Sequence, residues 1–524
     1  MDEISDTWVQ RLKNSECYPH RVDQVKLVET HISWVILTGE YAYKIKKPVK
    51  YSFVDFSTLE KRRWFCEEEL RLNGRLASEL YIGVVPITGS PFNPQIDGQG
   101  EAFDFAVKMN QFSVKQEINA ILADKENGEN VISLLAERIA AFHAQIEKVS
   151  VNLPYGNPDM VWQPMKECFD DIPAHHFSES TRHFLTIAKS WLQDEWRKLS
   201  DSIIHRKQGG FVRECHGDLH LGNIAIFKKS VCVFDALEFE PRLRWIDVMS
   251  EVAFLVMDLE RHGCRDLAFV FLNRYLELTG DYEGLKVFRL YLVYRAVVRA
   301  KVAGLQLAQL AENSVEKERA QSELAGYVEL AHRVIVGVSP SLILMHGVSG
   351  TGKTTVSREI VKALGAIHTR SDVERKRLFA ELLKAKIEEV QYGVLYSSDM
   401  TQRTYAQLQN ISRILLCAGY SVVVDATFLR FHQREQFRRL AKEQSCALFI
   451  MAVFASDSVL AERIERRTRE GRDASDATVK VMKRQQESQE PFTNAERPYV
   501  ISQDSSDPQS IISAIEELKG KVGL

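Results

Sequence analysis

The stretch HGDLHLGN, residues 216–223, places an aspartate two residues after a histidine and an asparagine five residues after that aspartate. Phosphoryl transfer from ATP requires an aspartate that orients the acceptor hydroxyl, and oxygen ligands that hold Mg²⁺ against the phosphates. The spacing therefore predicts Asp218 as the catalytic base, His216 as part of the same catalytic loop, and Asn223 as a metal ligand. The apolar run VCVF then leads into Asp235, which we expect to be the second metal ligand.

The same chemistry requires a lysine that reaches the α- and β-phosphates from an early strand, and a helix glutamate that orients it. The tripeptide AYK matches the A-x-K pattern of such a strand and makes Lys44 the candidate. The helical stretch CEEELRLNGRLA carries Glu69, which we expect to pair with Lys44, with Glu68 and Glu67 as alternatives. No G-x-G-x-x-G motif precedes this lysine, and the segment VETHISWVILTGE occupies its place.

HGDLHLGN followed by FDALEF resembles the aminoglycoside phosphotransferase-like kinases, a branch of the protein-kinase fold, over roughly residues 25–305. The resemblance implies a β-rich N-lobe, a helical C-lobe and ATP–Mg²⁺ between them. A pseudokinase that keeps this fold is the alternative. An aminoglycoside pocket would need several carboxylates for ammonium groups. We interpret the carboxylates after Asp235 as scaffold charges instead: Glu238, Glu240, Asp258 and Glu260.

A second phosphate-binding motif, G-x-x-x-x-G-K-T, follows the apolar run LILMH and precedes an amphipathic helix. Glycines let such a loop wrap so that its backbone N–H groups face phosphate oxygens. The lysine of the motif reaches the β- and γ-phosphates, and the threonine hydroxyl ligates Mg²⁺. The residues predicted to bind ATP here are Gly347, Ser349, Gly350, Thr351, Gly352, Lys353, Thr354 and Thr355, with Thr354 also a metal ligand.

Polar residues after later apolar runs complete this second constellation. HTRSDVERKRL contains Asp372 and Arg375, and SVVVDATF ends a predicted strand at Asp425, which we expect to hold Mg²⁺. Asp372 could instead cap a helix, and Asp425 could be a turn residue. The segment AERIERRTREGRDASD is expected to close over ATP as a lid and stabilise phosphate charge, although a solvated helix face is the alternative. Its predicted ATP-binding residues are Arg463, Arg467 and Arg472.

These residues resemble the small P-loop kinases, among them gluconate kinase, polynucleotide 5′-hydroxyl kinases, chloramphenicol phosphotransferase and the zeta toxins, over roughly residues 341–505. In such kinases an aspartate after the second strand contacts the acceptor hydroxyl, a catalytic role that the resemblance implies for Asp372 with Arg375 beside it. The arrangement of both halves resembles bacterial proteins described as bifunctional aminoglycoside phosphotransferase/ATP-binding proteins. That description concerns the folds and does not establish an aminoglycoside substrate.

The chain has 524 residues, too many for a single core. We predict an α+β protein-kinase-like domain of two lobes at 1–310, a helical linker at 311–340, and an α/β P-loop NTPase domain at 341–524. Short apolar runs separated by helical stretches predict a parallel sheet flanked by helices in the last domain. The net charge of −3 gives no general attraction to nucleic acid or anionic membrane.

The eight cysteines contain no C-x-x-C pair, which argues against a zinc site of the usual spacing and indicates a reducing compartment. We find no signal peptide and no apolar run long enough to span a membrane, so we expect a cytoplasmic protein.

The leading hypothesis is an enzyme with two ATP–Mg²⁺ sites that transfers the γ-phosphate of ATP to hydroxyl groups of a small molecule. One alternative makes the P-loop half a nucleotide-sensing regulator of the N-terminal kinase. The other is a nucleotide or nucleic-acid 5′-hydroxyl kinase, which the acidic net charge disfavours. The sequence does not identify either acceptor, the oligomeric state or any coupling between the sites.

Overall fold

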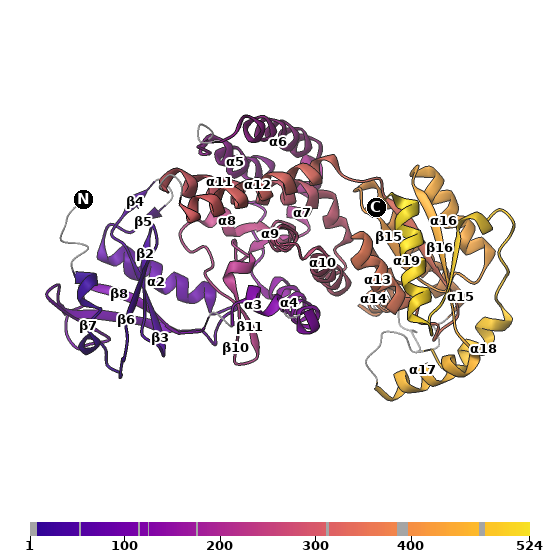
Figure 1. Ribbon diagram of the computed structural model, residues 1–524, viewed down its shortest axis with the longest axis horizontal. Coiled ribbons are helices and arrows are strands. Elements are labelled where there is room, and N and C mark those ends of the chain that lie inside the picture. The colour runs from indigo at the N-terminus through magenta and orange to yellow at the C-terminus, as the bar shows by residue number, and fades with distance from the viewer. Residues whose placement is uncertain are drawn as a thin grey trace. The chain divides into compact units, whose positions relative to one another are not determined.

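The protein forms two compact units, Met1–Asp258 with Leu290–Val328, and Leu259–Arg289 with Glu329–Leu524. Figure 1 shows the elements of both in the computed structural model. The units do not follow the predicted boundaries at 310 and 341 residue for residue, and the domain assignment stays a prediction. The structure describes residues 8–51, 54–113, 116–123, 125–173, 177–310, 314–384, 397–470 and 477–523.

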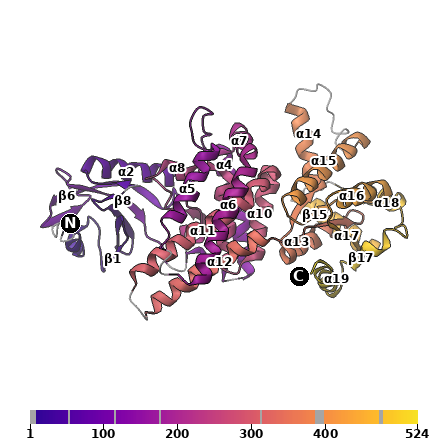
Figure 2. The same cartoon turned by 90° about the horizontal axis from the view of Figure 1, so that it is seen from above.

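A six-stranded antiparallel sheet with the strand order β1-β2-β3-β8-β6-β7 begins the first unit. Side chains of β3 alternate between its faces, so Tyr43 and Ile45 pack into one core while Lys44 and Lys46 face the other side. Helix α2 (Leu59–Asn73) lies on that other side, against β6 and β8 (Figure 2). The strands are β1 (Lys26–Glu29), β2 (Ser33–Leu37), β3 (Tyr41–Lys46), β6 (Tyr81–Ser90), β7 (Asn93–Ile96) and β8 (Asp104–Asn110).

Two short ladders in the first unit position the predicted catalytic loop. Strand β9 (Val212–Glu214) pairs with β12 (Trp245–Asp247), and β10 (Ile224–Phe227) pairs with β11 (Ser230–Val233). The loop 216–223 therefore runs from β9 to β10, and Asp235 follows β11. The helices around these ladders are α3 (Ile118–Leu122), α4 (Lys125–Gln145), α5 (Pro158–Asp170), α6 (Glu179–Lys198), α7 (Ser200–Gln208), α8 (Pro241–Arg244), α9 (Val248–Arg261), α11 (Leu285–Gln309) and α12 (Val315–Val336).

The second unit contains a five-stranded sheet in the order β14-β15-β13-β16-β17, and every pairing in it is parallel. This is the predicted parallel sheet. Its carboxyl edge collects the loops that follow the strands, which is where α/β sheets place ligands. The strands are β13 (Ser341–His346), β14 (Ile367–Arg370), β15 (Val422–Asp425), β16 (Ala447–Phe454) and β17 (Val500–Asp504).

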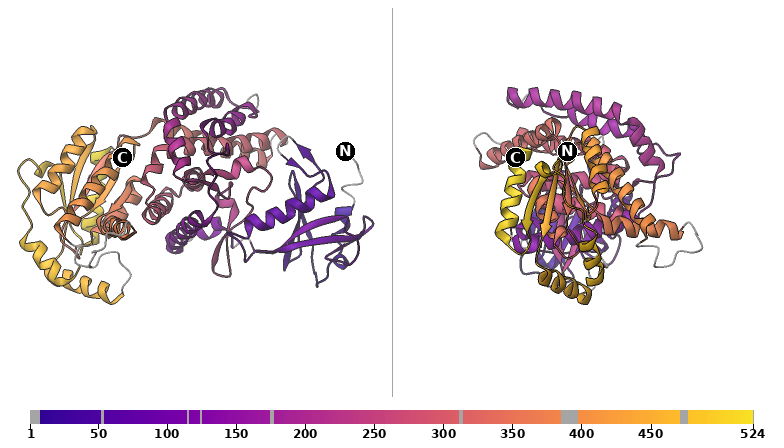
Figure 3. Two further views of the ribbon diagram at one scale, coloured as in Figure 1. Left: turned by 180° about the vertical axis from the view of Figure 1, so that it is seen from behind. Right: turned by 90° about the vertical axis from the view of Figure 1, so that its right-hand side faces the viewer.

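Helices cover both faces of this parallel sheet (Figure 3). Among the described residues of the chain, no helix is apolar over a length that would cross a bilayer. The helices of the second unit are α10 (Arg265–Thr279), α13 (Lys353–Leu364), α14 (Ser371–Lys384), α15 (Ser398–Cys417), α16 (Phe431–Glu443), α17 (Asp457–Glu470), α18 (Val479–Glu487) and α19 (Pro508–Val522).

Candidate active sites

The strand β3 and the helix α2 bring a lysine and a glutamate together in the first unit. Oε1 of Glu69 lies 2.9 Å from Nζ of Lys44, and Oε2 contacts Nζ of Lys46. The carboxylate of Glu69 is fully buried, so these two ammonium groups balance its charge. The two alternatives to Glu69 point elsewhere, since Glu67 pairs with a surface arginine and Glu68 pairs with two other arginines.

Asp235 approaches the same lysine from the segment after β11. Nζ of Lys44 donates a hydrogen bond to Oδ1 of Asp235, whose side chain is 48% exposed. The φ angle of Asp235 is 64°, in the left-handed region that residues with a Cβ rarely adopt. Such backbone strain, typically about 1–3 kcal/mol, is concentrated at functional sites. A half-exposed carboxylate held in this conformation is suited to exchange its lysine for a ligand.

Hydrogen bonds of His216 link the catalytic loop to the segment that carries Asp235. Its Nε2 donates to the carbonyl of Phe234 at 3.0 Å, and its Nδ1 accepts from the amide of Asp218 at 3.3 Å. Burial lowers the pKa of His216, so the ring is neutral and uses both nitrogens inside the protein. The catalytic role expected for His216 stays a prediction, and the two hydrogen bonds show that its ring links the catalytic loop to the segment after β11.

Asn223 and Asp218 are joined directly. Nδ2 of Asn223 donates to the backbone carbonyl of Asp218 at 3.0 Å and to its Oδ2 at 2.9 Å. Because both bonds use the amide nitrogen, the amide oxygen of Asn223 is the atom left to ligate a cation. Burial raises the pKa of Asp218, but attraction to His220, His216 and Arg299 outweighs this effect and holds the pKa well below its usual range. Asp218 is therefore an ionised carboxylate.

Two buried carboxylates on α9 hold the backbone of this loop, and the sequence did not single out the first. Glu251 accepts from the amide of Gly217 at 2.8 Å and lies 3.0 Å from Nε2 of His143. Asp258 accepts from the amide of Leu221 at 2.9 Å. A carboxylate within an apolar helical stretch is the signal that could have identified Glu251.

The carboxylates that were interpreted as scaffold charges have partners within the chain. Glu238 contacts Nζ of Lys46, Glu240 lies 3.2 Å from Arg242, and Arg333 lies 3.1 Å from Glu260. Asp258 also accepts from the hydroxyl of Tyr327 at 3.1 Å. These contacts agree with the interpretation and leave little carboxylate charge for a polycationic ligand.

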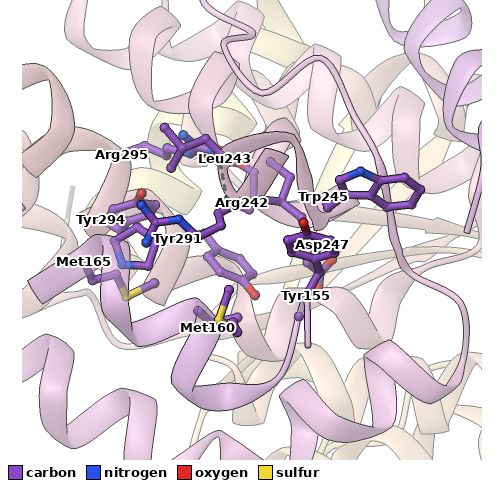
Figure 4. A pocket seen from close by; sticks show the side chains of 15 residues that line it. Tyr155, Met160, Met165, Arg242, Leu243, Trp245, Asp247, Tyr291, Tyr294 and Arg295 are labelled. Atoms are coloured by element: carbon purple, nitrogen blue, oxygen red, sulfur yellow. Dashed lines mark hydrogen bonds between the residues drawn. The ribbon is translucent and has the colours of Figure 1, made fainter. Parts of the chain in front are cut away.

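A narrow pocket with aromatic walls lies near the catalytic loop in the first unit (Figure 4). It is lined by residues of α5 and the segment just before it, of the segment that contains α8 and β12, of the first turn of α9, and of α11. Arg295, one of its lining residues, lies with Nη1 3.5 Å from the carbonyl of Gly217. Pocket and loop therefore share a buried arginine. Its aromatic side chains are Tyr155, Trp245, Tyr291 and Tyr294.

In the second unit, the glycine-rich loop connects the end of β13 to the start of α13. Gly347, Gly350 and Gly352 have φ angles of 144°, 89° and 84°, which other residues rarely adopt. A Cβ on Gly347 would lie 2.4 Å from the carbonyl of Val453, so the loop also needs glycine for space. Nζ of Lys353 donates to the carbonyls of Gly347 and Val348, both at 2.9 Å.

The two predicted metal ligands of this site touch one another. Oγ1 of Thr354 donates to Oδ2 of Asp425 at 2.6 Å, and Nε2 of His368 lies 3.4 Å from the same oxygen. Burial raises the pKa of Asp425, but hydrogen bonds from His368 and Thr354 outweigh this effect and lower it to about 2. Thr351 is buried and bonds to Val348, and Thr355 is exposed in the first turn of α13.

Asp372 lies in the first turn of α14, directly after β14 and at the same edge of the sheet. Nη1 of Arg375 lies 3.3 Å from Oδ1 of Asp372, so the two predicted catalytic residues form an ion pair one turn apart. Burial lowers the pKa of Lys353, and the charges of Asp425 and Asp372 oppose that shift. The segments at the ends of β14 and β15 therefore bring two carboxylates, those of Asp372 and Asp425, to the edge of the sheet where the glycine-rich loop also lies.

The arginine-rich helix α17 packs against the glycine-rich loop. The carbonyl of Leu460 lies 3.1 Å from where a Cβ on Gly350 would be, and Ile464 lies equally near. The guanidinium of Arg463 bonds to Ser505 at 2.7 Å, and Nη2 of Arg467 bonds to the carbonyl of Ala477 at 2.7 Å. Arg472 lies outside the described residues.

One residue that contacts the glycine-rich loop is not indicated by any motif in the sequence. Oε1 of Gln485, in α18, accepts a hydrogen bond from the backbone amide of Ser349 at 2.7 Å. Met482, one turn earlier in α18, belongs to the apolar cluster that also contains Val348. No local motif marks a glutamine so distant in sequence.

Comparison with known proteins gives a family match for the second unit. The family model described as "AAA domain" matches residues 342–492, which contain the glycine-rich loop and most of the parallel sheet. Together with the loop geometry, this match defines a P-loop nucleotide-binding domain of mixed α/β structure.

The chain is also 29% identical over 449 residues to an uncharacterized protein of Mycobacterium tuberculosis (strain ATCC 25618 / H37Rv). That match covers 85% of this chain and 87% of the relative, and a Mycobacterium bovis protein has the same values.

Several solved kinase structures are similar to parts of the chain. An amicoumacin kinase in complex with AMP-PNP and Ca²⁺ shares 11% identity at a TM-score of 0.40, covering 63% of this chain and 94% of that protein. A Plasmodium vivax ethanolamine kinase shares 10% sequence identity at a TM-score of 0.35, and the match covers 58% of this chain and 82% of that protein. A gluconokinase from Sinorhizobium meliloti 1021 shares 20% sequence identity at a TM-score of 0.26, and the match covers 35% of this chain and 97% of that protein.

Proposed function

We propose that the protein is an ATP-dependent phosphotransferase with two nucleotide sites, one in each unit, which transfers the γ-phosphate of ATP to a hydroxyl group of a small molecule. The observation that carries this proposal is that the carboxylates of Glu69 and Asp235 both contact the ammonium group of Lys44. These residues come from a strand, a helix and a loop that are far apart in sequence. Kinases of the protein-kinase type use this combination for phosphoryl transfer.

The donor atoms of the first site suit Mg²⁺. The amide oxygen of Asn223 and the carboxylate of Asp235 are the hard oxygen ligands that Mg²⁺ prefers. Bound Mg²⁺ would neutralise charge on the phosphates. Lys44 would bind the α- and β-phosphates while Glu69 holds it in place. Asp218 would orient the acceptor hydroxyl and take its proton on Oδ1, because Oδ2 is held by Asn223.

The second site has a parallel division of roles. Lys353 and the backbone amides of the glycine-rich loop would bind the phosphates, and Thr354 with Asp425 would hold the cation. Asp372 would orient the second acceptor, with Arg375 beside it. Arg463 and Arg467, on a helix that packs against the loop, would stabilise phosphate charge.

A regulatory role for the second unit is the other candidate. The contact that favours it is the hydrogen bond from Ser349 to Gln485, since the chain itself occupies an amide that would otherwise face phosphate. Under this candidate, nucleotide binding changes the contacts of α18 without phosphoryl transfer at the P-loop. For the acceptor of the first unit, we favour a small molecule without several ammonium groups, because nearby carboxylates are paired.

Calorimetry with AMP-PNP and Mg²⁺ tests the two-site proposal. We expect two binding events in the wild-type protein, loss of one in Lys353→Ala, and weakening of the other in Lys44→Ala. Circular dichroism of both variants provides the control for folding. A wild-type protein with a single nucleotide site would overturn the proposal.

A further inference from the structure

The ammonium group of Lys46 lies next to the nucleotide lysine and has a different set of partners. Lys46 is two residues after Lys44 in β3 and faces the same side of the sheet. Its Nζ contacts Oε2 of Glu69 and Oε1 of Glu238. The side chains of Lys46 and Glu69 have no exposed surface, and that of Glu238 is 4% exposed.

Two ion pairs therefore connect β3 to the segment that carries Asp235. Lys44 contacts Asp235, and Lys46 contacts Glu238 three residues later, with Glu69 shared between the two lysines. The first pair is partly exposed, and the proposed function assigns both of its members to the nucleotide and its cation. Once they bind those ligands, they no longer hold one another. The second pair is buried and keeps its partners.

We propose that Lys46 and Glu238 are positioning residues for the first nucleotide site, holding Asp235 at the place where it ligates the cation of ATP. The inference rests on the proposed function of the first unit. Glu238 lies only three residues from Asp235, whose left-handed backbone is not the intrinsic preference of an aspartate. A fixed anchor close to Asp235 on the chain would maintain that conformation after Lys44 has left.

The test uses a variant that removes the pair without changing the net charge, Lys46→Met with Glu238→Gln, in a Lys353→Ala background that silences the second site. Removing Lys46 alone would leave the buried carboxylate of Glu238 without its counter-charge, which is strongly destabilising. AMP-PNP binding is measured by calorimetry over a series of Mg²⁺ concentrations, and thermal unfolding is recorded without nucleotide. The matched control is Lys47→Met with Glu29→Gln, which removes the neighbouring, partly exposed ion pair.

We expect the Mg²⁺ concentration needed for half-maximal AMP-PNP binding to rise about 10–100-fold, the usual effect of removing a group that supports a metal ligand. Excess Mg²⁺ should restore binding, since Asn223 and Asp235 are intact, whereas a general structural defect would weaken binding at every Mg²⁺ concentration. The control pair should not shift the midpoint.

An unchanged Mg²⁺ midpoint in the folded double variant would overturn the inference. If the double variant does not fold, Glu238→Leu alone is measured, because leucine removes the contact with Lys46 while Glu69 still balances the charge of Lys46. An unchanged midpoint there also overturns it. Failure of the proposed function gives a different result, since the Lys353→Ala parent would then show no nucleotide binding that depends on Lys44.

Discussion

Replacing Asp218 by asparagine separates catalysis from nucleotide binding in the first unit. Oδ2 of Asp218 accepts from Nδ2 of Asn223 at 2.9 Å. In Asp218→Asn, the amide oxygen takes over that bond, so the NH₂ group occupies the place of Oδ1. An NH₂ group donates hydrogen bonds and cannot accept the proton of a hydroxyl. The substitution therefore removes the proton acceptor while the contact that shapes the loop persists.

The expected loss follows from the role assigned to this carboxylate. Positioned acid–base groups contribute about 10²–10⁴-fold to rate, which corresponds to roughly 3–5 kcal/mol of transition-state stabilisation. The activity is measured as phosphorylation of an acceptor, or as slow ATP hydrolysis, in the Lys353→Ala background. Affinity for AMP-PNP–Mg²⁺ should change little, whereas Asp235→Asn should weaken it. Equal activity of Asp218→Asn and its parent would refute the reasoning and identify the first unit as a pseudokinase.

Two further predictions concern the second unit. Gln485→Ala should bind AMP-PNP about 2–10-fold more tightly at the P-loop, because the Ser349 amide no longer has to exchange a hydrogen bond of about 0.5–1.5 kcal/mol. The control is Gln486→Ala, which removes a contact to Asp457 instead. Weaker binding by Gln485→Ala would contradict the prediction. The folded-state pKa of Asp425 is lowered to about 2, whereas that of an aspartate in the unfolded chain is near 4. Its ionised carboxylate therefore stabilises the folded state by about 2 kcal/mol above pH 4, and this contribution is lost as the pH falls through 2. Between pH 5 and pH 2, wild-type protein should therefore lose more thermal stability than Asp425→Asn. Equal losses would show that the ionised carboxylate of Asp425 does not stabilise the fold.

Local sequence determined much of what could be predicted about these sites. The residues between His216 and Asn223 are close in the chain, so their spacing alone brought Asp218 and Asn223 into one loop. The glycine-rich loop is equally local, and the continuous apolar runs identified the parallel strands because both faces of that sheet are buried. The choice of Lys44 also followed a local pattern.

The remaining partners depend on packing that no local pattern records. Three consecutive glutamates were candidates for Lys44, and the rotational phase of α2 against the sheet brings Glu69 to it. Lys46 shares a face with Lys44 because side chains two residues apart on a strand point to the same side, a signal that is present in the sequence. Gln485 reaches Ser349 from a helix after α17, and only the folded chain brings them together.

Both sites have one physical feature in common: the groups that would bind ATP and its cation bind one another in the structure. Lys44 contacts Asp235, Thr354 contacts Asp425, and Lys353 bonds to the carbonyls of its own loop. Buried polar groups need partners, so a site that waits for a charged ligand must supply them from within.

Exposure then separates the contacts that exchange from those that stay. The contact between Lys44 and Asp235 includes a half-exposed carboxylate, so phosphate and a cation can displace it. The pair formed by Lys46 and Glu238 is enclosed, and separating it would leave the buried carboxylate of Glu238 without its counter-charge. The same lysine–carboxylate chemistry thus serves ligand exchange at Lys44 and permanent positioning at Lys46, two residues apart on one strand.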